Sequence, residues 1–143
     1  MDTKVGDGPL TGVRVVDLTN VIMGPFATHI LADMGADVIK IESPEGDSFR
    51  GYKPLRNDGM SGGFLHLNRN KRSVVLNLKQ KEDCTILDRL IATADVFVHS
   101  LRPKAIARLG YDYAYVAVSG GLQLKTSGAH SLQPIISASG AYS

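Results

Sequence analysis

The chain has 143 residues, a hydrophobic share of 43%, a charged share of 21% and a formal net charge of +2. These values are typical of a globular protein with one core, and they exclude nucleic-acid binding through overall charge. The single cysteine, Cys84, excludes an intrachain disulfide. No apolar run approaches the roughly 18 residues that a membrane span needs, and the polar start lacks the apolar segment of a secretory signal. We therefore expect a cytoplasmic location, with an organelle matrix as the alternative, and neither membrane nor nucleic acid as a partner.

The chain begins with a strand, a helix and a second strand. Residues 13–18 form a short β-branched run that predicts a buried strand. Gly24 and Pro25 open a helical pattern that ends before Gly35, a residue suited to terminating a helix. Residues 37–42 predict the second strand. Because the connections are short, the three elements form a βαβ unit, in which the two strands are parallel.

The alternation continues after a loop at residues 43–63 that is rich in glycine, proline and charge. Residues 64–67 are expected to pair briefly as a strand, and residues 68–72 to form a basic turn. The later elements are predicted as a strand at 73–78, a helix at 80–94, a strand at 95–99, a short helix at 103–109 and a weaker strand at 115–119. The pattern predicts a Rossmann-like α/β fold, an open and mostly parallel sheet with helices on both faces.

Ligands of such sheets bind beyond the carboxyl ends of the strands. A dinucleotide site would need Gly-x-Gly-x-x-Gly in the first turn, where this chain has only Gly24. We therefore disfavour NAD, and we interpret Glu42, placed where a ribose-binding acid would stand, as a solvated acid at a strand end. Arg102 lies just beyond a strand end, so a ligand contact and an ordinary surface charge both stay open for it, as for Lys104 and Arg108.

The strongest cluster of cations is Arg69, Lys71 and Arg72, flanked by asparagines and Ser73. Such a turn suits phosphate groups, which accept charge-assisted hydrogen bonds, although the residues alone favour a solvated basic loop. No Gly-x-Ser-x-Gly motif indicates a hydrolase. Cys84 falls on the apolar stripe of its helix and is expected in the core. The histidines lack metal-ligand spacing; they are His29, His66, His99 and His130.

Several segments resemble one family in their order, spacing and residue identities. They are LTGVRVVDLT at 10–19, GPFA at 24–27, LADMGADVIKIE at 31–42, PEGD at 44–47, NRNKRS at 68–73, ADVFV at 94–98 and RLGY at 108–111. Together they resemble the N-terminal part of the class III CoA-transferases, a group that includes formyl-CoA and carnitine CoA-transferases and α-methylacyl-CoA racemases. The resemblance covers about residues 10–113, so residues 10–143 are expected to form part of the family's large domain, after an extended or disordered segment at 1–9.

The resemblance implies a Rossmann-like domain, an interlocked homodimer, and coenzyme A (CoA) held by backbone groups and a few cations, with no metal. The implied contacts are Val21, Ile22, Lys71, Arg72, Leu76, Asn77, Leu78, Lys79, Ser100, Leu101, Arg102 and Arg108. It also implies transfer of CoA from an acyl-CoA to a carboxylic acid through an aspartate nucleophile. That aspartate is expected beyond the last residue, since no acid follows Asp112, so no nucleophile is assigned. His130 is a weak candidate for a ligand-contacting or proton-transferring residue.

Three hypotheses follow. The first is a CoA-transferase or acyl-CoA racemase relative that is inactive as this chain alone. The second is a non-catalytic module that binds CoA or forms dimers. The third is an unrelated Rossmann-like nucleotide binder.

Overall fold

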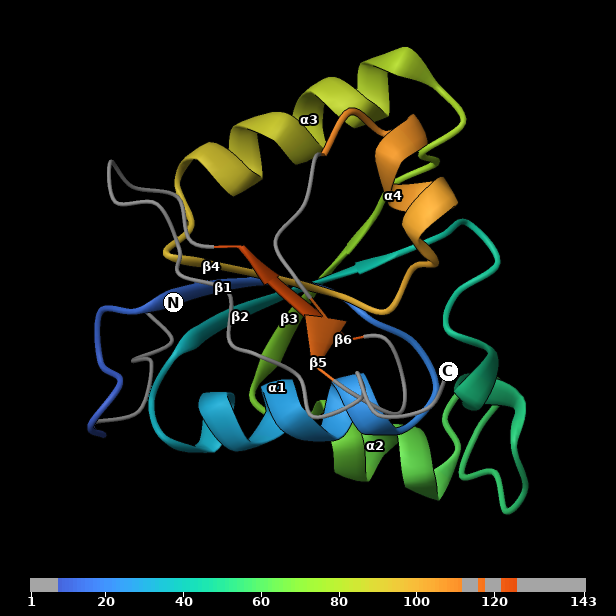
Figure 1. Ribbon diagram of the computed structural model, residues 1–143. Helices are drawn as coiled ribbons and strands as arrows, with labels where there is room; N and C mark the ends of the chain where they lie inside the picture. Colours follow the sequence, from blue (N-terminus) through green and yellow to red (C-terminus); the bar gives the residue numbers. More distant parts are fainter. Residues whose placement is uncertain (1–7, 112–115, 118–121, 126–143) are drawn as a thin grey trace, which may run out of the picture.

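The computed structural model describes residues 8–111, 116–117 and 122–125. Six strands form one sheet in the order β3-β2-β1-β4-β6-β5 (Figure 1). The strands are β1 (Arg14–Leu18), β2 (Asp37–Glu42), β3 (Lys71–Val75), β4 (Val96–His99), β5 (Val116–Ala117) and β6 (Leu122–Lys125). The first four are mutually parallel, whereas β6 is antiparallel to β4 and β5. The predicted open, mostly parallel sheet is confirmed.

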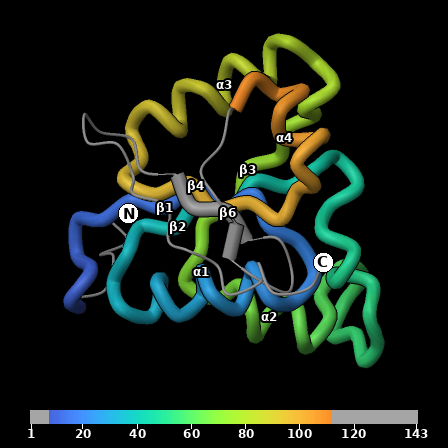
Figure 2. Tube along the Cα trace, viewed as in Figure 1, coloured from blue at the N-terminus to red at the C-terminus, as the bar shows by residue number. Residues whose placement is uncertain are grey.

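Helices cover both faces of this sheet, as expected (Figures 1 and 2). They are α1 (Met23–Asp33), α2 (Gly62–Asn68), α3 (Lys81–Ala92) and α4 (Pro103–Arg108), with a short 3-10 helix, η1, at Ser48–Gly51. One face carries α1 and α2, and the other carries α3 and α4 (Figure 1). The first helix ends where predicted, because Gly35 adopts a φ of 95° that costs a glycine little.

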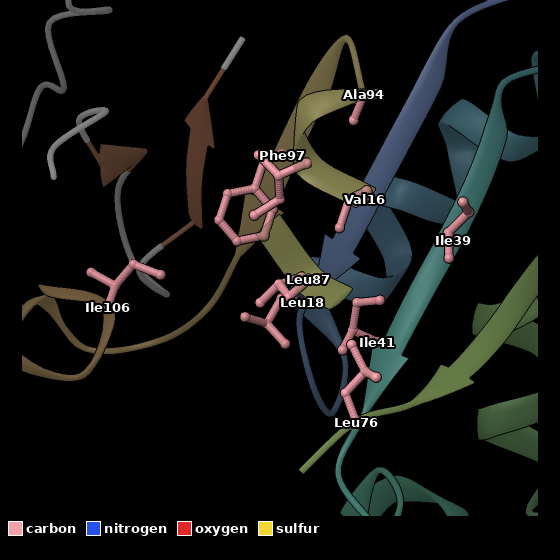
Figure 3. Close-up of a cluster of buried hydrophobic side chains, with 10 residues drawn as sticks. Val16, Leu18, Ile39, Ile41, Leu76, Leu87, Ala94, Phe97 and Ile106 are labelled. Carbon is pink, nitrogen blue, oxygen red and sulfur yellow. The ribbon is translucent and has the colours of Figure 1, made fainter. Parts of the chain in front are cut away.

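The core divides between the two faces because successive side chains of a strand point to opposite sides. Toward α3 and α4, Val16, Ile39 and Phe97 pack with Leu87 and further aliphatic side chains (Figure 3). Toward α1, a second cluster contains Val15, Val38, Val98, Ala32 and Ala36. Farther along the strands on the α1 face, the buried positions are charged rather than aliphatic: Asp17, Lys40 and Glu42.

Two expected elements are wrong in detail. Residues 64–67 belong to α2 instead of a strand, because the Ser61 hydroxyl caps this helix by accepting from the Phe64 amide at 2.9 Å. The third strand covers Lys71–Val75 rather than 73–78. It starts directly after Asn70, whose φ of 61° ends the turn, and Lys71 already pairs with Val38.

Among the described helices, none has the length and apolar character that crossing a membrane requires.

Two adjacent residues of α3 test the position of the core. Leu87 is 1% exposed and Ile86 is 42% exposed. We expect Leu87→Ala to lower the free energy of unfolding by about 2–5 kcal/mol, because the truncation leaves a cavity. Ile86→Ala, which removes a comparable side chain from the surface, should change it by less than about 0.5 kcal/mol. Urea denaturation measures both, and equal losses would contradict the assigned helix face.

Candidate functional site

The carboxyl edge of the parallel strands gathers three segments that are distant in sequence. The turn after β1 contains Val21 and Ile22, the turn after β4 contains Ser100, Leu101 and Arg102, and the turn after β3 holds residues 76–79. The first two are joined directly, since the Asn20 amide donates to the Ser100 hydroxyl at 3.2 Å. The structure therefore brings most of the predicted CoA contacts to one edge, the position that open α/β sheets use for ligands.

The first turn presents apolar side chains on an unusual backbone. Val21 adopts a φ of 70°, a left-handed conformation that is an outlier for a β-branched residue. Its amide donates to the Asp47 carboxylate at 3.1 and 3.3 Å. Val21 and Ile22 are 38% and 46% exposed. Gly24 packs so closely that an added Cβ would lie 2.3 Å from the Thr19 Cβ, so this turn requires glycine at that position.

The third segment, after β3, is ordered by its own hydrogen bonds. The Asn77 amide donates to the Asp83 carboxylate at 2.7 Å, and the Lys79 amide donates to the Asn77 side chain at 3.2 Å. Leu76 is buried and Leu78 packs against the same core. Lys79 is exposed and is the residue of this segment with a cationic side chain available at the surface.

Beneath the edge lies a network of buried charges between the sheet and α1. The Lys71 ammonium contacts the Asp17 carboxylate at 3.1 Å, and both side chains are at most 1% exposed. It also donates to the Pro25 carbonyl at 2.8 Å, the Thr28 hydroxyl at 2.8 Å and the Asn68 side chain at 3.0 Å. Burial lowers the pKa of Lys71, and the Asp17 carboxylate opposes that change.

A second buried pair joins β2 to the loop that follows it. The Lys40 ammonium contacts the Asp47 carboxylate at 2.9 Å, with side chains 1% and 0% exposed. Lys40 also donates to the Thr19 carbonyl at 2.8 Å. The carboxylate accepts the Val21 amide, as above, and the Phe49 amide at 2.9 Å. Since every partner lies in the turn or in the loop, this pair ties the two segments together.

Glu42 completes the network, and its interpretation as a solvated acid is wrong. It is 2% exposed and accepts two hydrogen bonds of 2.7 Å from the Arg50 guanidinium. The Ser73 hydroxyl and the Asp47 amide donate to it as well, at 2.6 and 3.1 Å. Burial alone would raise the pKa of Glu42, but the hydrogen bonds, above all those from Arg50, lower it to about 2.

The basic cluster, for which the residues favoured a solvated loop over a phosphate turn, is divided among three internal partners. Arg69 bonds Asp33 at 2.6 Å, Lys71 is buried as described, and Arg72 bonds Asp37 at 2.6 Å. Asp37 and Arg72 stand at the amino ends of β2 and β3, so the structure does not bring Arg72 to the edge with the other predicted contacts. The resemblance implied that Lys71 and Arg72 contact CoA; the site proposed below leaves both out.

The cations around α4 are placed differently. Arg102, Lys104 and Arg108 are exposed, and none of them makes an ion pair with another residue in the described ranges. Arg102 directly precedes α4 and follows Ser100, at the edge. Arg108 lies in the last turn of α4, one helix length farther away.

The remaining candidate residues are histidines and Cys84. His29 is 3% exposed, and burial lowers its pKa. Within the described ranges no group of three histidine, cysteine or acidic side chains is arranged to hold a metal. Cys84 is half-buried on α3, and its thiol contacts the Leu78 carbonyl at 3.4 Å. His130 lies outside the described residues.

Asp17, Lys40 and Asp47 hold the segments of this edge together, and the sequence did not single them out as functional residues. A signal for two of them was present, because Asp17 and Lys40 interrupt otherwise apolar strands at the period-two positions of one face. A charge at such a position is buried and requires a partner. The pattern does not identify the partner, since Lys71 and Asp47 come from other segments.

The sheet and its helices define a Rossmann-like α/β domain, a class whose ligands bind beyond the carboxyl ends of the parallel strands. The profile of CoA-transferase family III matches residues 10–118. The chain belongs to this family, as its sequence segments predicted.

Relatives and solved structures agree. The chain is 43% identical over 117 residues to the succinate–glutarate CoA-transferase of Agrobacterium fabrum, covering 77% of this chain and 29% of that one. It is 46% identical over 111 residues to the acetyl-CoA:oxalate CoA-transferase of Acetobacter aceti, with coverage of 77% and 28%. A CAIB/BAIF family protein from Brucella suis superposes with a TM-score of 0.70 at 37% identity, over 76% of this chain and 30% of that one. The chain thus spans less than a third of the length of these relatives.

The hydrogen bonds to Glu42 predict that the stability of the chain depends on pH. Because the pKa of Glu42 falls from 4.5 unfolded to about 2 folded, its ionisation stabilises the folded chain above pH 4.5, and this contribution disappears as the pH falls toward 2. The shift corresponds to about 3 kcal/mol. We expect Glu42→Gln to lower the free energy of unfolding at pH 7. Below pH 4 the free energies of unfolding of the variant and the parent should become more similar. Urea denaturation at several pH values measures this, and a difference independent of pH would contradict it.

Proposed function

We propose that this chain supplies the CoA-binding edge of an enzyme that moves CoA between an acyl-CoA and a carboxylic acid. The observation that carries the proposal is the convergence of the turns after β1, β3 and β4 at one edge, with Arg102 and Lys79 exposed there. Apolar Val21 and Ile22 suit the pantetheine and adenine parts of CoA, and the cations suit its phosphates. The predicted contacts that the edge contains are Val21, Ile22, Leu76, Asn77, Leu78, Lys79, Ser100, Leu101 and Arg102.

Transfer is favoured over racemisation because the relatives described above are named CoA-transferases. Their names pair acyl-CoA donors with acids such as glutarate and oxalate, and we extend only the class, a carboxylic acid, to this chain. No nucleophile is assigned here. The buried carboxylates beneath the edge, Asp17, Glu42 and Asp47, are occupied by cations and hydroxyl or amide donors, so none is available to attack a thioester.

The homodimer implied by the resemblance is also part of the proposal. Its support in the structure is a row of exposed apolar side chains along α1, Met23, Phe26, Ile30 and Met34, which are 40–68% exposed. Such rows mark association surfaces. Because the resemblance implies the dimer for the full-length protein, analytical ultracentrifugation tests it there: a mass twice that of one full-length subunit supports the dimer, and a monomer at high concentration contradicts it.

Calorimetric titration with CoA tests the binding site. We expect binding that weakens with salt, since charged contacts are screened, and no comparable binding of NAD. Arg102→Ala should weaken CoA binding about tenfold, the value of one lost charge-assisted contact.

Arg72→Ala is the matched control, because it removes the same side chain from the opposite edge. We expect it to change the affinity by less than about twofold. A larger loss for Arg72→Ala than for Arg102→Ala would restore Arg72 as a contact and contradict the site placed here. Failure of the folded parent to bind CoA, or tighter binding of NAD, would overturn the proposed function.

A further inference from the structure

Val21 occupies a conformation that its side chain disfavours, at the centre of the proposed CoA edge. A β-branched residue with a φ of 70° persists only when its surroundings hold it there. Val21 is 38% exposed, so contacts of its side chain account for only part of this restraint. The backbone amide supplies the other part through its hydrogen bonds.

The group that restrains the backbone is the Asp47 carboxylate. Its two oxygens accept the Val21 amide at 3.1 and 3.3 Å, and one of them accepts the Phe49 amide at 2.9 Å. The carboxylate is itself fixed, since Lys40 contacts it at 2.9 Å and Glu42 accepts the amide of Asp47 at 3.1 Å. Its side chain is 0% exposed, so water does not compete for these bonds.

Lys40 closes the arrangement from the other side. Its ammonium donates to the carbonyl of Thr19 at 2.8 Å, and Thr19 starts the same turn. The turn from Thr19 to Val21 is thus held at both ends by one buried ion pair. If Val21 changed to a common backbone conformation, its amide would lose the hydrogen bond to Asp47. No water reaches this buried carboxylate to replace the lost bond.

We propose that Asp47 is a positioning residue for CoA, which holds the Thr19–Val21 turn in the conformation that exposes Val21 and Ile22 to the ligand. The inference rests on the proposed function, because it concerns the same edge. Asp47 does not touch the ligand. It raises the fraction of molecules whose turn is ready to bind, and the apparent affinity follows that fraction.

Two double variants separate positioning from general stability. Removing Asp47 alone would leave the Lys40 ammonium buried without its partner, which endangers folding. Both variants therefore carry Lys40→Met. Lys40→Met/Asp47→Asn keeps an oxygen that accepts the Val21 amide, whereas Lys40→Met/Asp47→Leu replaces that side chain by an apolar one of similar shape.

The expected results concern CoA affinity and the Val21 amide. If about one turn in ten keeps its conformation without the acceptor, the Kd for CoA of the leucine variant rises about tenfold. The asparagine variant should stay within about threefold of the parent, and hydrogen exchange at the Val21 amide should be fast only in the leucine variant. Asp37→Ala, which destabilises the opposite edge by freeing Arg14 and Arg72, is the control for lost stability and should leave the Kd within about twofold.

The outcomes distinguish the two proposals. Equal CoA affinity of the leucine and asparagine variants, with the parent binding CoA, would overturn the role of Asp47 and leave the proposed function intact. An equal loss in Asp37→Ala would also overturn it, by making stability the cause. Absence of CoA binding to the folded parent would overturn the proposed function and this inference with it. If the leucine variant does not fold, fast exchange at Val21 in the asparagine variant would overturn the inference, because the acceptor oxygen is retained there.

Discussion

The structure depends on charges buried between the sheet and α1. A charged side chain in the interior is costly unless its partner is held at hydrogen-bond distance. Asp17 in β1 meets this condition through Lys71 of β3, and Lys40 in β2 meets it through Asp47 of the following loop. Each pair joins two different segments of the chain. Folding of β1, β2 and β3 and ordering of the loop are therefore coupled.

This arrangement distinguishes the two edges of the sheet. At the amino edge, Arg14 and Arg72 both pair with Asp37, so the cations are matched by a carboxylate. At the carboxyl edge Asp17, Glu42 and Asp47 are buried and paired, while Arg102, Lys79 and the Glu45 carboxylate are exposed.

The turn after β1 differs from the corresponding turn of dinucleotide-binding Rossmann folds. Dinucleotide-binding turns use glycines so that the backbone approaches the ligand closely. Here a single glycine, Gly24, provides the close packing on Thr19, and a valine adopts the left-handed backbone conformation. The conformation that glycine would adopt at little cost is held in this chain by the Asp47 carboxylate. The missing glycine motif therefore disfavours an NAD-type turn and leaves a different ligand at the same edge possible.

The sequence alone determined the family through its matching segments. It also determined the alternation of strands and helices and the parallel sheet, because β-branched runs, the helical spacing of apolar residues and Gly35 are local signals. It also indicated the edge at which we propose that the ligand binds, since that edge follows from strand polarity. The destination of each charge was decided only by the tertiary structure. Arg69, Lys71 and Arg72 are adjacent in sequence, yet three different partners bind them. Glu42 was expected to be a solvated acid at the end of a strand. In the structure it is buried, because Arg50 and Ser73 cover it and donate hydrogen bonds to it. A period-two pattern can mark a buried charge such as Asp17 or Lys40, but it does not identify the partner, which is set only when the sheet is assembled.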